Sequence, residues 1–230
     1  MSAISPESFL KRSAVYRNLT GARFKEMAGS AIVAANNNGS DKATRSGLLD
    51  LSTLPRVGYR GGNAASFLET VDLPVPSKPN QFLQASGGEL VLRLSPQEFW
   101  VLSALRDEGE NIEALRRRQL PTSDCYSLYC QDSHAWLVMT GEHLPQTLAK
   151  VCGVDLSDEA FPVGAIAQTS VARINVIVVH HEVNNIPCFS LLCDSAAAEY
   201  LWDCLLDAMG EFGGEAVGIE CLVQNLSGKN

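Results

Sequence analysis

The amino-acid sequence predicts an α+β fold built from two related halves, each with a β-α-β-β-α order of elements and an antiparallel sheet. Two observations predict this class. A strand pattern followed by glycine and a helical pattern occurs twice, 80 residues apart, and each copy continues with a hairpin and a second helix. A period near 80 residues is too long for a solenoid, so the repeat indicates a pseudo-symmetric pair.

The first copy begins with residues 56–60, RVGYR, which form a predicted strand that ends at Gly61. A helix follows, because apolar residues recur at helical spacing. The apolar runs at 89–94 and 99–105 are separated by a Ser-Pro pair and predict a hairpin. A segment with charged flanks, from about 108 to 118, predicts the closing helix. The apolar face of the first helix consists of Ala64, Phe67, Leu68 and Val71.

The second copy begins with the strand pattern WLVMT at 136–140, which ends at Gly141. A helix with proline in its first turn follows. Residues 169–181 predict one long strand, residues 183–187 a turn, and residues 188–193 a returning strand. The last helix has an apolar stripe at mostly three- and four-residue spacing. The stripe consists of Ala197, Leu201, Cys204, Leu205, Ala208, Met209 and Phe212.

The segment before the repeat has a different character. Residues 9–33 contain a short, weak helical pattern, and residues 34–46 are polar without an apolar period, which predicts a loop. We therefore predict several units along the chain. They are a basic N-terminal segment at 1–50 with a polar loop at 34–46, an α+β domain at 51–222 with halves 51–120 and 121–222, and a tail at 223–230.

The charge of the chain is unevenly distributed. The 230 residues carry a formal net charge of −8, but residues 1–60 contribute +5 and residues 61–230 contribute −13. An overall acidic chain is a poor match for nucleic acid, which is bound by basic surfaces. The basic segment is expected either to fold over its own acidic body or to extend to another subunit.

Membrane and secreted proteins are not favoured. No apolar stretch is long enough to span a bilayer, and the N-terminus lacks the hydrophobic stretch of a signal peptide. The cysteines are odd in number and lack CxxC spacing, which is typical of reduced, mostly buried thiols in a cytoplasmic protein. The seven are Cys125, Cys130, Cys152, Cys188, Cys193, Cys204 and Cys221.

Few residues are placed for catalysis or metal binding. No serine or cysteine occupies a tight turn of the kind that activates a nucleophile. The triplet Asp132-Ser133-His134 has the residue types of a triad, but neighbouring side chains on a strand point to opposite faces. The same argument separates His180 from His181 and Cys188 from Cys193, although one His and one Cys could meet across the hairpin. We expect no catalytic residue and no metal site.

Glycines precede the first helix of the first copy. Gly61 and Gly62 lie just before Asn63, where a helix N-terminus could accept an anion. Their spacing differs from GxGxxG, so a tight strand-to-helix turn is the favoured interpretation. Gly61 and Gly62 are therefore weak candidates for cofactor binding, and a binding or assembly protein is favoured over an enzyme.

Several segments resemble a known family. The segments are LSPQEFWVLSAL, the region from SHAWLVMTGEHLPQTL to FPVGAIAQTSVARINVIVV, and AEYLWDCLLDAM. They are similar to the gamma subunit of heterotetrameric sarcosine oxidases and of N-methylglutamate dehydrogenases. The leading segments GARFKEMAG and RSGLLDLSTLPRVGYRGGNAASFL resemble the wider aminomethyltransferase family, which includes the glycine-cleavage T-protein. The resemblance covers about residues 5–222 and implies the family's folate-binding fold without its C-terminal barrel.

The resemblance also implies where tetrahydrofolate would bind. Catalytic members hold it with an Asp, a Glu and an Arg from three short segments. The corresponding segments here are GGELVL at 87–92, NIPCFS at 185–190 and GIECLV at 218–223. The first contains no Asp, Ser190 stands in place of the Glu, and Leu222 stands in place of the Arg. Glu89 lies too early in its segment to be more than a weak candidate for cofactor binding.

The resemblance therefore implies a non-catalytic, gamma-type subunit of a flavin-dependent complex that oxidatively demethylates a secondary amine such as sarcosine. FAD, FMN and tetrahydrofolate would belong to larger flavoprotein subunits, and this chain would pack against the large, folate-handling one. The alternatives are a stand-alone tetrahydrofolate-dependent aminomethyl or methyl transferase and a folate-binding regulator. Tetrahydrofolate is expected on this chain only under these alternatives.

Overall fold

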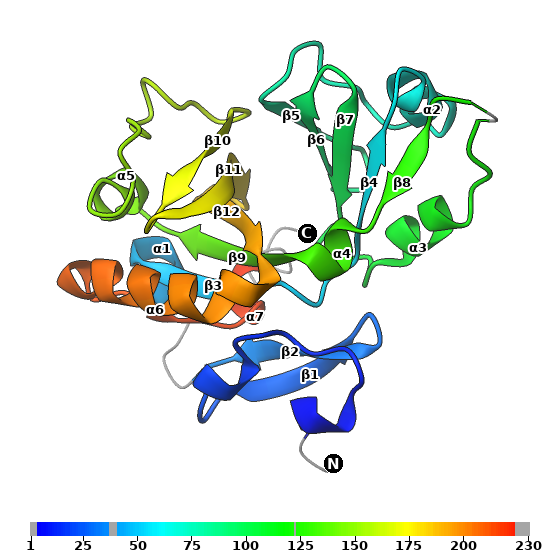
Figure 1. Ribbon diagram of the computed structural model, residues 1–230. Coiled ribbons are helices and arrows are strands. Elements are labelled where there is room, and N and C mark those ends of the chain that lie inside the picture. Colours follow the sequence, from blue (N-terminus) through cyan, green and yellow to red (C-terminus); the bar gives the residue numbers. More distant parts are fainter. Residues whose placement is uncertain (1–3, 37–40, 122, 224–230) are drawn as a thin grey trace, which may run out of the picture.

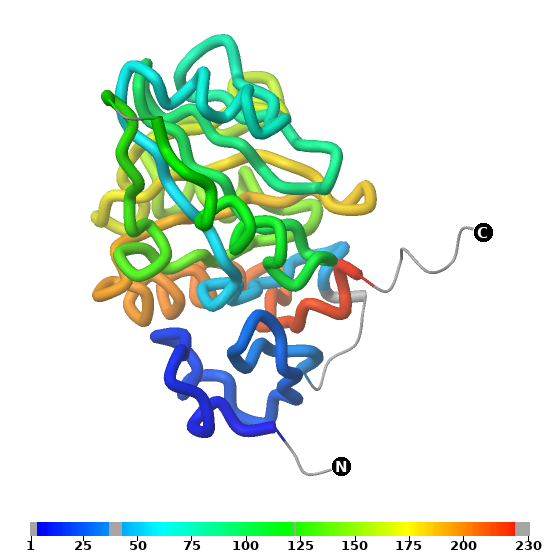
Figure 2. The backbone as a smooth tube through the Cα atoms, turned by 90° about the vertical axis from the view of Figure 1, so that its right-hand side faces the viewer, coloured from blue at the N-terminus to red at the C-terminus, as the bar shows by residue number. Residues whose placement is uncertain are grey.

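The computed structural model describes residues 4–36, 41–121 and 123–223. Two sheets lie face to face, and helices cover the outer face of each sheet (Figure 1). A smaller N-terminal lobe lies below these layers in both views (Figures 1 and 2). This is the predicted α+β class, and the strand pairs within each half are antiparallel as expected.

The two halves repeat one order of elements, which confirms the pseudo-repeat. The order is strand, helix, three strands and helix, so each half has one strand more than predicted. The first half consists of β4 (Arg56–Arg60), α2 (Ala64–Thr70), β5 (Gln81–Gln84), β6 (Leu90–Ser95), β7 (Glu98–Leu102) and α3 (Glu110–Arg116). The second half consists of β9 (His134–Thr140), α5 (Leu144–Leu148), β10 (Ile166–Val171), β11 (Ile174–Val183), β12 (Ile186–Asp194) and α6 (Ala198–Met209).

The extra strand has a different origin in each half. In β5, QFLQ, only Phe82 is buried, so the apolar signal is too short to predict a strand. In the second half, the prediction of one long strand at 169–181 is wrong. The chain reverses at Ala172 and Arg173, whose φ values of 49° and 69° are left-handed, and two strands result.

Each sheet also contains one strand from outside its own half. This strand belongs to the segment that directly precedes the other half. β3 (Gly47–Asp50) precedes the first half but pairs with β9, and β8 (Tyr126–Leu128) precedes the second half but pairs with β4. The sheet orders are therefore β5-β6-β7-β4-β8 and β10-β11-β12-β9-β3-β13, where β13 is Glu215–Ala216. The division into 1–50, 51–120 and 121–222 stays a prediction, and these strands pair across its boundaries.

Strand alternation creates three apolar cores. In β9, Leu137 and Met139 pack in the core that contains residues of α5 and α6, whereas Trp136 and Val138 pack in the core between the two sheets. The third core lies between the five-stranded sheet and the helices α2 and α3. Because the middle core draws on both sheets, the two halves form one packed body.

Helix α6 confirms its prediction with one shift. Asp194 accepts a hydrogen bond from the Ala196 N–H and caps the short 3-10 turn η3 (Ser195–Ala197) before the helix. The buried stripe contains Ala198 and Trp202, whereas the predicted Ala197 and Cys204 are half-buried. The helix continues into η4 (Gly210–Phe212) and stops at Gly213, which is left-handed. The complete buried set is Ala198, Leu201, Trp202, Leu205, Ala208 and Met209.

The N-terminal lobe corrects two expectations. The helical pattern expected at 9–33 is wrong, since Gly21 and Gly29 adopt left-handed φ and bound a hairpin strand. The loop expected at 34–46 is partly wrong, because it includes the end of β2 and the helix α1; residues 37–40 lie outside the described residues. The elements are η1 (Pro6–Ser8), η2 (Tyr16–Asn18), β1 (Arg23–Met27), β2 (Ser30–Ala35) and α1 (Asp41–Arg45), and α7 (Glu220–Val223) closes the described chain.

The cysteines fit the expected thiols. All seven are unpaired, six are buried, and Cys204 is half-buried. Burial raises the pKa of Cys130 and Cys193 to about 11, so these thiols stay protonated at neutral pH. In the part of the chain that the structure describes, no helix has both the length and the apolar content to cross a bilayer.

Arg56 holds the two crossing connections together. It begins β4 and is only 1% exposed. Its backbone N–H donates to the Gln131 side-chain carbonyl at 2.9 Å, and the Gln131 amide donates to the Ser52 carbonyl at 3.2 Å. The guanidinium donates to five backbone carbonyls, two before β4, two in the helix α4 (Cys130–Ser133) and one at the first residue of β9. They belong to Ser52, Leu54, Cys130, Gln131 and His134.

Carbonyl dipoles take the place of a counterion around Arg56. Within the described residues Arg56 forms no ion pair, and burial lowers its pKa to about 10, so it remains charged at neutral pH. Asp50 is buried close by, and burial raises the pKa of its carboxyl. Five charge-assisted hydrogen bonds offset the cost of burying the cation.

Arg56→Met is expected to destabilise the fold. The substitution removes the guanidinium donor from five backbone carbonyls in buried or part-buried hydrogen bonds, which costs ~3–5 kcal/mol of unfolding free energy. Arg60→Met is the matched control, because Arg60 is 61% exposed and pairs only with Glu98, so its loss costs under ~1 kcal/mol. Urea unfolding measures both values, and equal effects of the two substitutions would contradict the role assigned to Arg56.

Candidate functional site

The candidate site is a cavity of about 410 Å³ at one end of the core between the sheets, here called the inter-sheet pocket. The turn before β6, the segment after β7, the centre of β9, the end of β11 and the helix α7 surround it. Nine of its eighteen lining residues are apolar. They are Leu51, Leu90, Ala104, Leu105, Trp136, Val138, Val183, Leu222 and Val223.

Two of the three segments singled out in the sequence line this pocket, and the second lies directly behind its wall. Gly87, Gly88 and Leu90 line it from the first segment, and Leu222 and Val223 line it from the third. The second segment begins at the β11–β12 turn, whose Asn184 lines the pocket and donates a hydrogen bond to the Leu222 carbonyl. Residues far apart in sequence thus meet as the resemblance implies.

The floor of the pocket contains a hydrogen-bonded chain of three side chains. The Trp136 indole N–H donates to the Ser190 hydroxyl at 2.9 Å, and the same hydroxyl lies 2.8 Å from Nε2 of His181. Trp136 and His181 line the pocket, and Ser190 is fully buried behind them. The hydroxyl of Ser190 is therefore engaged by the protein itself.

The interior of the pocket is electrically neutral. Burial lowers the pKa of His181 to about 3, so its imidazole is uncharged at neutral pH. Leu222 is fully buried where a charged side chain would face the cavity. The charged lining residues Arg106 and Glu182 are exposed at the rim. Such a pocket can enclose an uncharged, apolar group, but it offers no buried charge to orient or activate a ligand.

Sequence reasoning missed the chain of Trp136, Ser190 and His181. A signal was present, because the two-residue turn at Asn184 and Asn185 fixes the register of β11 and β12. That register places His181 opposite Cys188, two residues from Ser190 on the same strand face. One His and one Cys do meet across the hairpin, but the partner that His181 bonds is a serine.

Glu89 points away from the inter-sheet pocket. Since Leu90 faces the middle core, Glu89 faces the opposite side of the sheet, where it is 4% exposed. It lines a second cavity of about 290 Å³, and its Oε1 accepts a hydrogen bond of 2.5 Å from Asn111 of α3. The structure therefore places this carboxylate outside the inter-sheet pocket, although its segment lines that pocket.

Gly61 and Gly62 accommodate a close crossing of the chain. A Cβ on Gly61, whose φ is 136°, would lie 2.1 Å from the Asp124 carbonyl oxygen, and a Cβ on Gly62 would lie 2.4 Å from the Asp124 carboxylate. The Asn63 N–H donates to the same Asp124 carbonyl at 2.9 Å. Neither glycine lines the inter-sheet pocket. Gly141 is the pseudo-symmetric equivalent of Gly61, and a Cβ on Gly141 would lie 2.4 Å from the Arg45 carbonyl oxygen.

The triplet at 132–134 forms a helix end. Asp132 and Ser133 belong to the short helix α4 (Cys130–Ser133), and His134 starts β9. The Ser133 hydroxyl lies 2.8 Å from Nδ1 of His134, while no hydrogen bond links Asp132 to His134 among the described residues. In the same part of the chain no three His, Cys, Asp or Glu side chains gather as metal ligands.

His181→Gln is expected to weaken the acid sensitivity of the fold. Burial lowers the folded-state pKa of His181 to about 3. Below about pH 6.5, His181 therefore binds a proton in the unfolded chain but stays neutral in the folded chain. Stability therefore falls as the pH drops, by up to ~1.4 kcal/mol per pH unit from this group. Urea unfolding of both proteins from pH 7 to pH 5 measures the difference; parallel curves would contradict a neutral, buried His181.

Comparison with known proteins identifies the family and the fold. The family model described as the GCVT N-terminal domain matches residues 22–225. The comparison with curated protein sequences gave no significant match.

Two solved structures share the fold. One chain of the heterotetrameric sarcosine oxidase from Corynebacterium sp. U-96, in complex with pyrrole 2-carboxylate, is 19% identical with a TM-score of 0.64. The match covers 90% of this chain and 98% of that one. The glycine cleavage system aminomethyltransferase T from Bartonella henselae is 16% identical with a TM-score of 0.66, and the match covers 92% of this chain but 60% of that one.

The family model spans both halves of the fold and all three segments around the inter-sheet pocket. The chain therefore belongs to the GCVT N-terminal domain family, whose aminomethyltransferase-like, folate-binding fold it adopts.

Proposed function

We propose that this protein is a non-catalytic, gamma-type subunit of a flavin-dependent, sarcosine oxidase-like complex that oxidatively demethylates a secondary amine. One observation carries the proposal. The fold extends over 98% of a chain of a heterotetrameric sarcosine oxidase, but over only 60% of an aminomethyltransferase. The match therefore takes in nearly all of the sarcosine oxidase chain, which supports the proposal.

The chemistry of the inter-sheet pocket supports the same proposal. The three segments meet there, yet Ser190 is held by Trp136 and His181, and Leu222 closes the wall as an apolar residue. A transferase needs charged groups that stabilise charge in the transition state. The pocket retains the shape of a ligand site without these groups.

The proposal assigns cofactors to the partners. FAD, FMN and tetrahydrofolate reside in larger flavoprotein subunits, and this chain packs against the large, folate-handling subunit. The unpaired thiols are typical of the cytoplasm, where we place the complex.

A second candidate function rests on the volume of the inter-sheet pocket. A cavity of about 410 Å³ with apolar walls falls within the usual range for small-molecule sites. A tetrahydrofolate-dependent transferase with an altered site, or a folate-binding regulator, would use this cavity. Folate binding by the isolated chain distinguishes these alternatives from the proposed subunit.

Affinity purification from the native host is expected to return larger flavin-containing chains in fixed stoichiometry with this protein. The reason is that a subunit without its own chemistry acts only through assembly. Flavin absorbance and peptide mass spectrometry of the purified material provide the measurement. Recovery of this chain alone, from cells that express it at native level, would contradict the proposed function.

Calorimetric titration of the full chain with tetrahydrofolate is expected to show no binding in the micromolar range, because the inter-sheet pocket has no buried charge for the ligand. The aminomethyltransferase from Bartonella henselae, titrated in the same buffer, is the positive control. Micromolar or tighter binding to this chain would favour the transferase or the regulator.

A further inference from the structure

Residues 9–19 of the N-terminal lobe have one side fixed to the body and one side free. Val15 is fully buried, and Leu19 is 5% exposed, in the core that also contains residues of α5 and α6. Ser13 is buried and hydrogen-bonds the Asp50 carboxyl of β3. These contacts hold the segment rigidly against the second half. Between Val15 and Leu19, Tyr16 is half-buried and Arg17 is exposed.

The outward side holds two arginines on one aromatic ring. The guanidinium carbons of Arg12 and Arg17 lie over the Tyr16 ring, 5.7 Å and 4.8 Å from its centroid. Both arginines are exposed, and neither forms an ion pair within the described residues. Stacking on Tyr16 limits their rotamer freedom, so their planar donor groups are preorganised for carboxylates.

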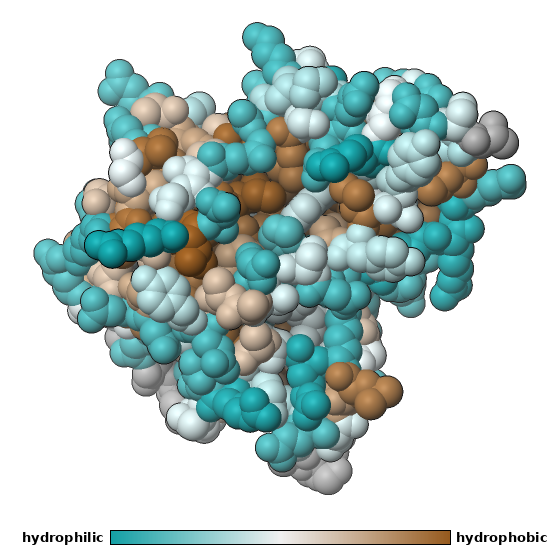
Figure 3. All heavy atoms as spheres, in the orientation of Figure 1, coloured by the Kyte–Doolittle hydropathy of each residue, from teal (hydrophilic) through white to brown (hydrophobic). Residues whose placement is uncertain are grey.

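An exposed apolar side chain, Leu10, lies two residues before Arg12 in the sequence. Leu10 is 104% exposed, the most exposed large apolar side chain of the described residues, and Ile4 is 38% exposed. The surrounding lobe is mainly hydrophilic on the face that Figure 3 shows. We call Leu10, Arg12, Tyr16 and Arg17 the arginine–tyrosine surface. Arginine and tyrosine are enriched among residues that dominate protein–protein binding energy.

The charge of the lobe indicates the chemistry of its partner. Described residues 4–36 carry five basic and two acidic side chains, a net +3, and the pair Arg23–Glu220 already links the lobe to the body. The arginines at 12 and 17 are thus additional to the contacts that hold the lobe in place. Among the residues that the structure describes, no ion pair neutralises either arginine, and a carboxylate from outside the chain would relieve their mutual repulsion.

We propose that the arginine–tyrosine surface docks a carboxylate-rich face of the large subunit, with Leu10 inserted into an apolar depression of that face. The inference rests on the proposed function and specifies where the complex forms. Arg12 and Arg17 bind carboxylates of the partner in fork geometry, and Tyr16 holds both guanidinium groups in position.

The test is a purification of full-length tagged variants from the native host. Arg12→Glu combined with Arg17→Glu is expected to lower the flavin recovered per mole of chain about tenfold or more, because attraction becomes repulsion. Arg12→Lys combined with Arg17→Lys keeps the positive charge but removes the two-pronged guanidinium donor. This variant is expected to recover an amount of flavin between those of the wild type and the Glu variant. Leu10→Ala also lowers recovery, and it leaves the stability unchanged because Leu10 is fully exposed.

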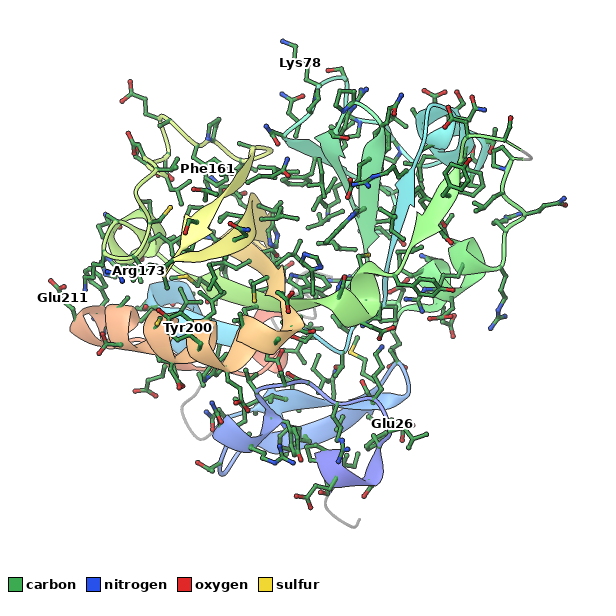
Figure 4. All side chains as sticks on the ribbon, viewed as in Figure 1. Glu26, Lys78, Phe161, Arg173, Tyr200 and Glu211 are labelled. Atoms are coloured by element: carbon green, nitrogen blue, oxygen red, sulfur yellow. The ribbon has the colours of Figure 1, made fainter. Side chains whose placement is uncertain are left out.

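The matched control is Arg117→Glu with Arg118→Glu, which changes the net charge by the same amount at two exposed arginines just after α3. Lys78→Glu is a second control, at the opposite end of the molecule from the N-terminal lobe in Figure 4. Both control proteins are expected to recover flavin as the wild type does. Thermal unfolding of every variant confirms that it folds.

The outcomes separate the two proposals. If the wild type recovers no flavoprotein, the proposed function fails and the docking surface fails with it. If the wild type and the Arg12/Arg17 reversal recover flavoprotein equally, the docking surface alone is wrong. Light scattering of the isolated chain gives a further contradiction: a dimer that the reversal abolishes would assign this surface to a second copy of the chain.

Discussion

The structure depends on a buried arginine that binds the backbone of two crossing connections. β3 precedes the first half but pairs with the sheet of the second, and β8 precedes the second half but pairs with the sheet of the first. The chain therefore crosses twice between the halves. At that crossing the Arg56 guanidinium donates to carbonyls on both connections. A single cation with five backbone acceptors therefore fixes the two halves in one orientation. At pseudo-symmetric positions, Gly61 and Gly141 admit the close approach of Asp124 and Arg45, which lie just before β8 and β3.

The orientation of the halves determines what the inter-sheet pocket can do. Face-to-face sheets bring three segments from both halves and from α7 to one cavity, although no two of these segments are neighbours in sequence. The side chains at the cavity are neutral or apolar, and the one polar network on its floor is satisfied internally. The fold therefore holds a ligand-sized space without a buried charge at its wall. Figure 4 shows Tyr200 of α6 close to Arg173 of the β10–β11 turn, and the Tyr200 hydroxyl donates to the Ala172 carbonyl of that turn.

Local sequence patterns predicted the elements that repeat and missed those that depend on distant contacts. Strand β9 and helix α6 have strong periodicity and a defined start, so both were predictable. The exchange of β3 and β8 was not, since a strand of four or three residues carries no information about its partner. Arg56 was likewise read only as part of a strand, because its five acceptors are carbonyl groups, which are the same for every residue type. At the pocket, the resemblance indicated which segments converge, but the hydrogen bond between Ser190 and His181 depends on the register of a hairpin that the sequence placed only approximately.

The central claim is that this chain contributes structure and no cofactor to a larger flavin-dependent assembly. Native mass spectrometry of the intact complex from the host tests it directly, because single subunits can be ejected with their tightly bound ligands. The account predicts that this chain is ejected at its bare mass of 24.8 kDa, while the flavins remain on the other chains. Ejection with the added mass of a folate or a flavin, or detection only as a free monomer, would contradict it.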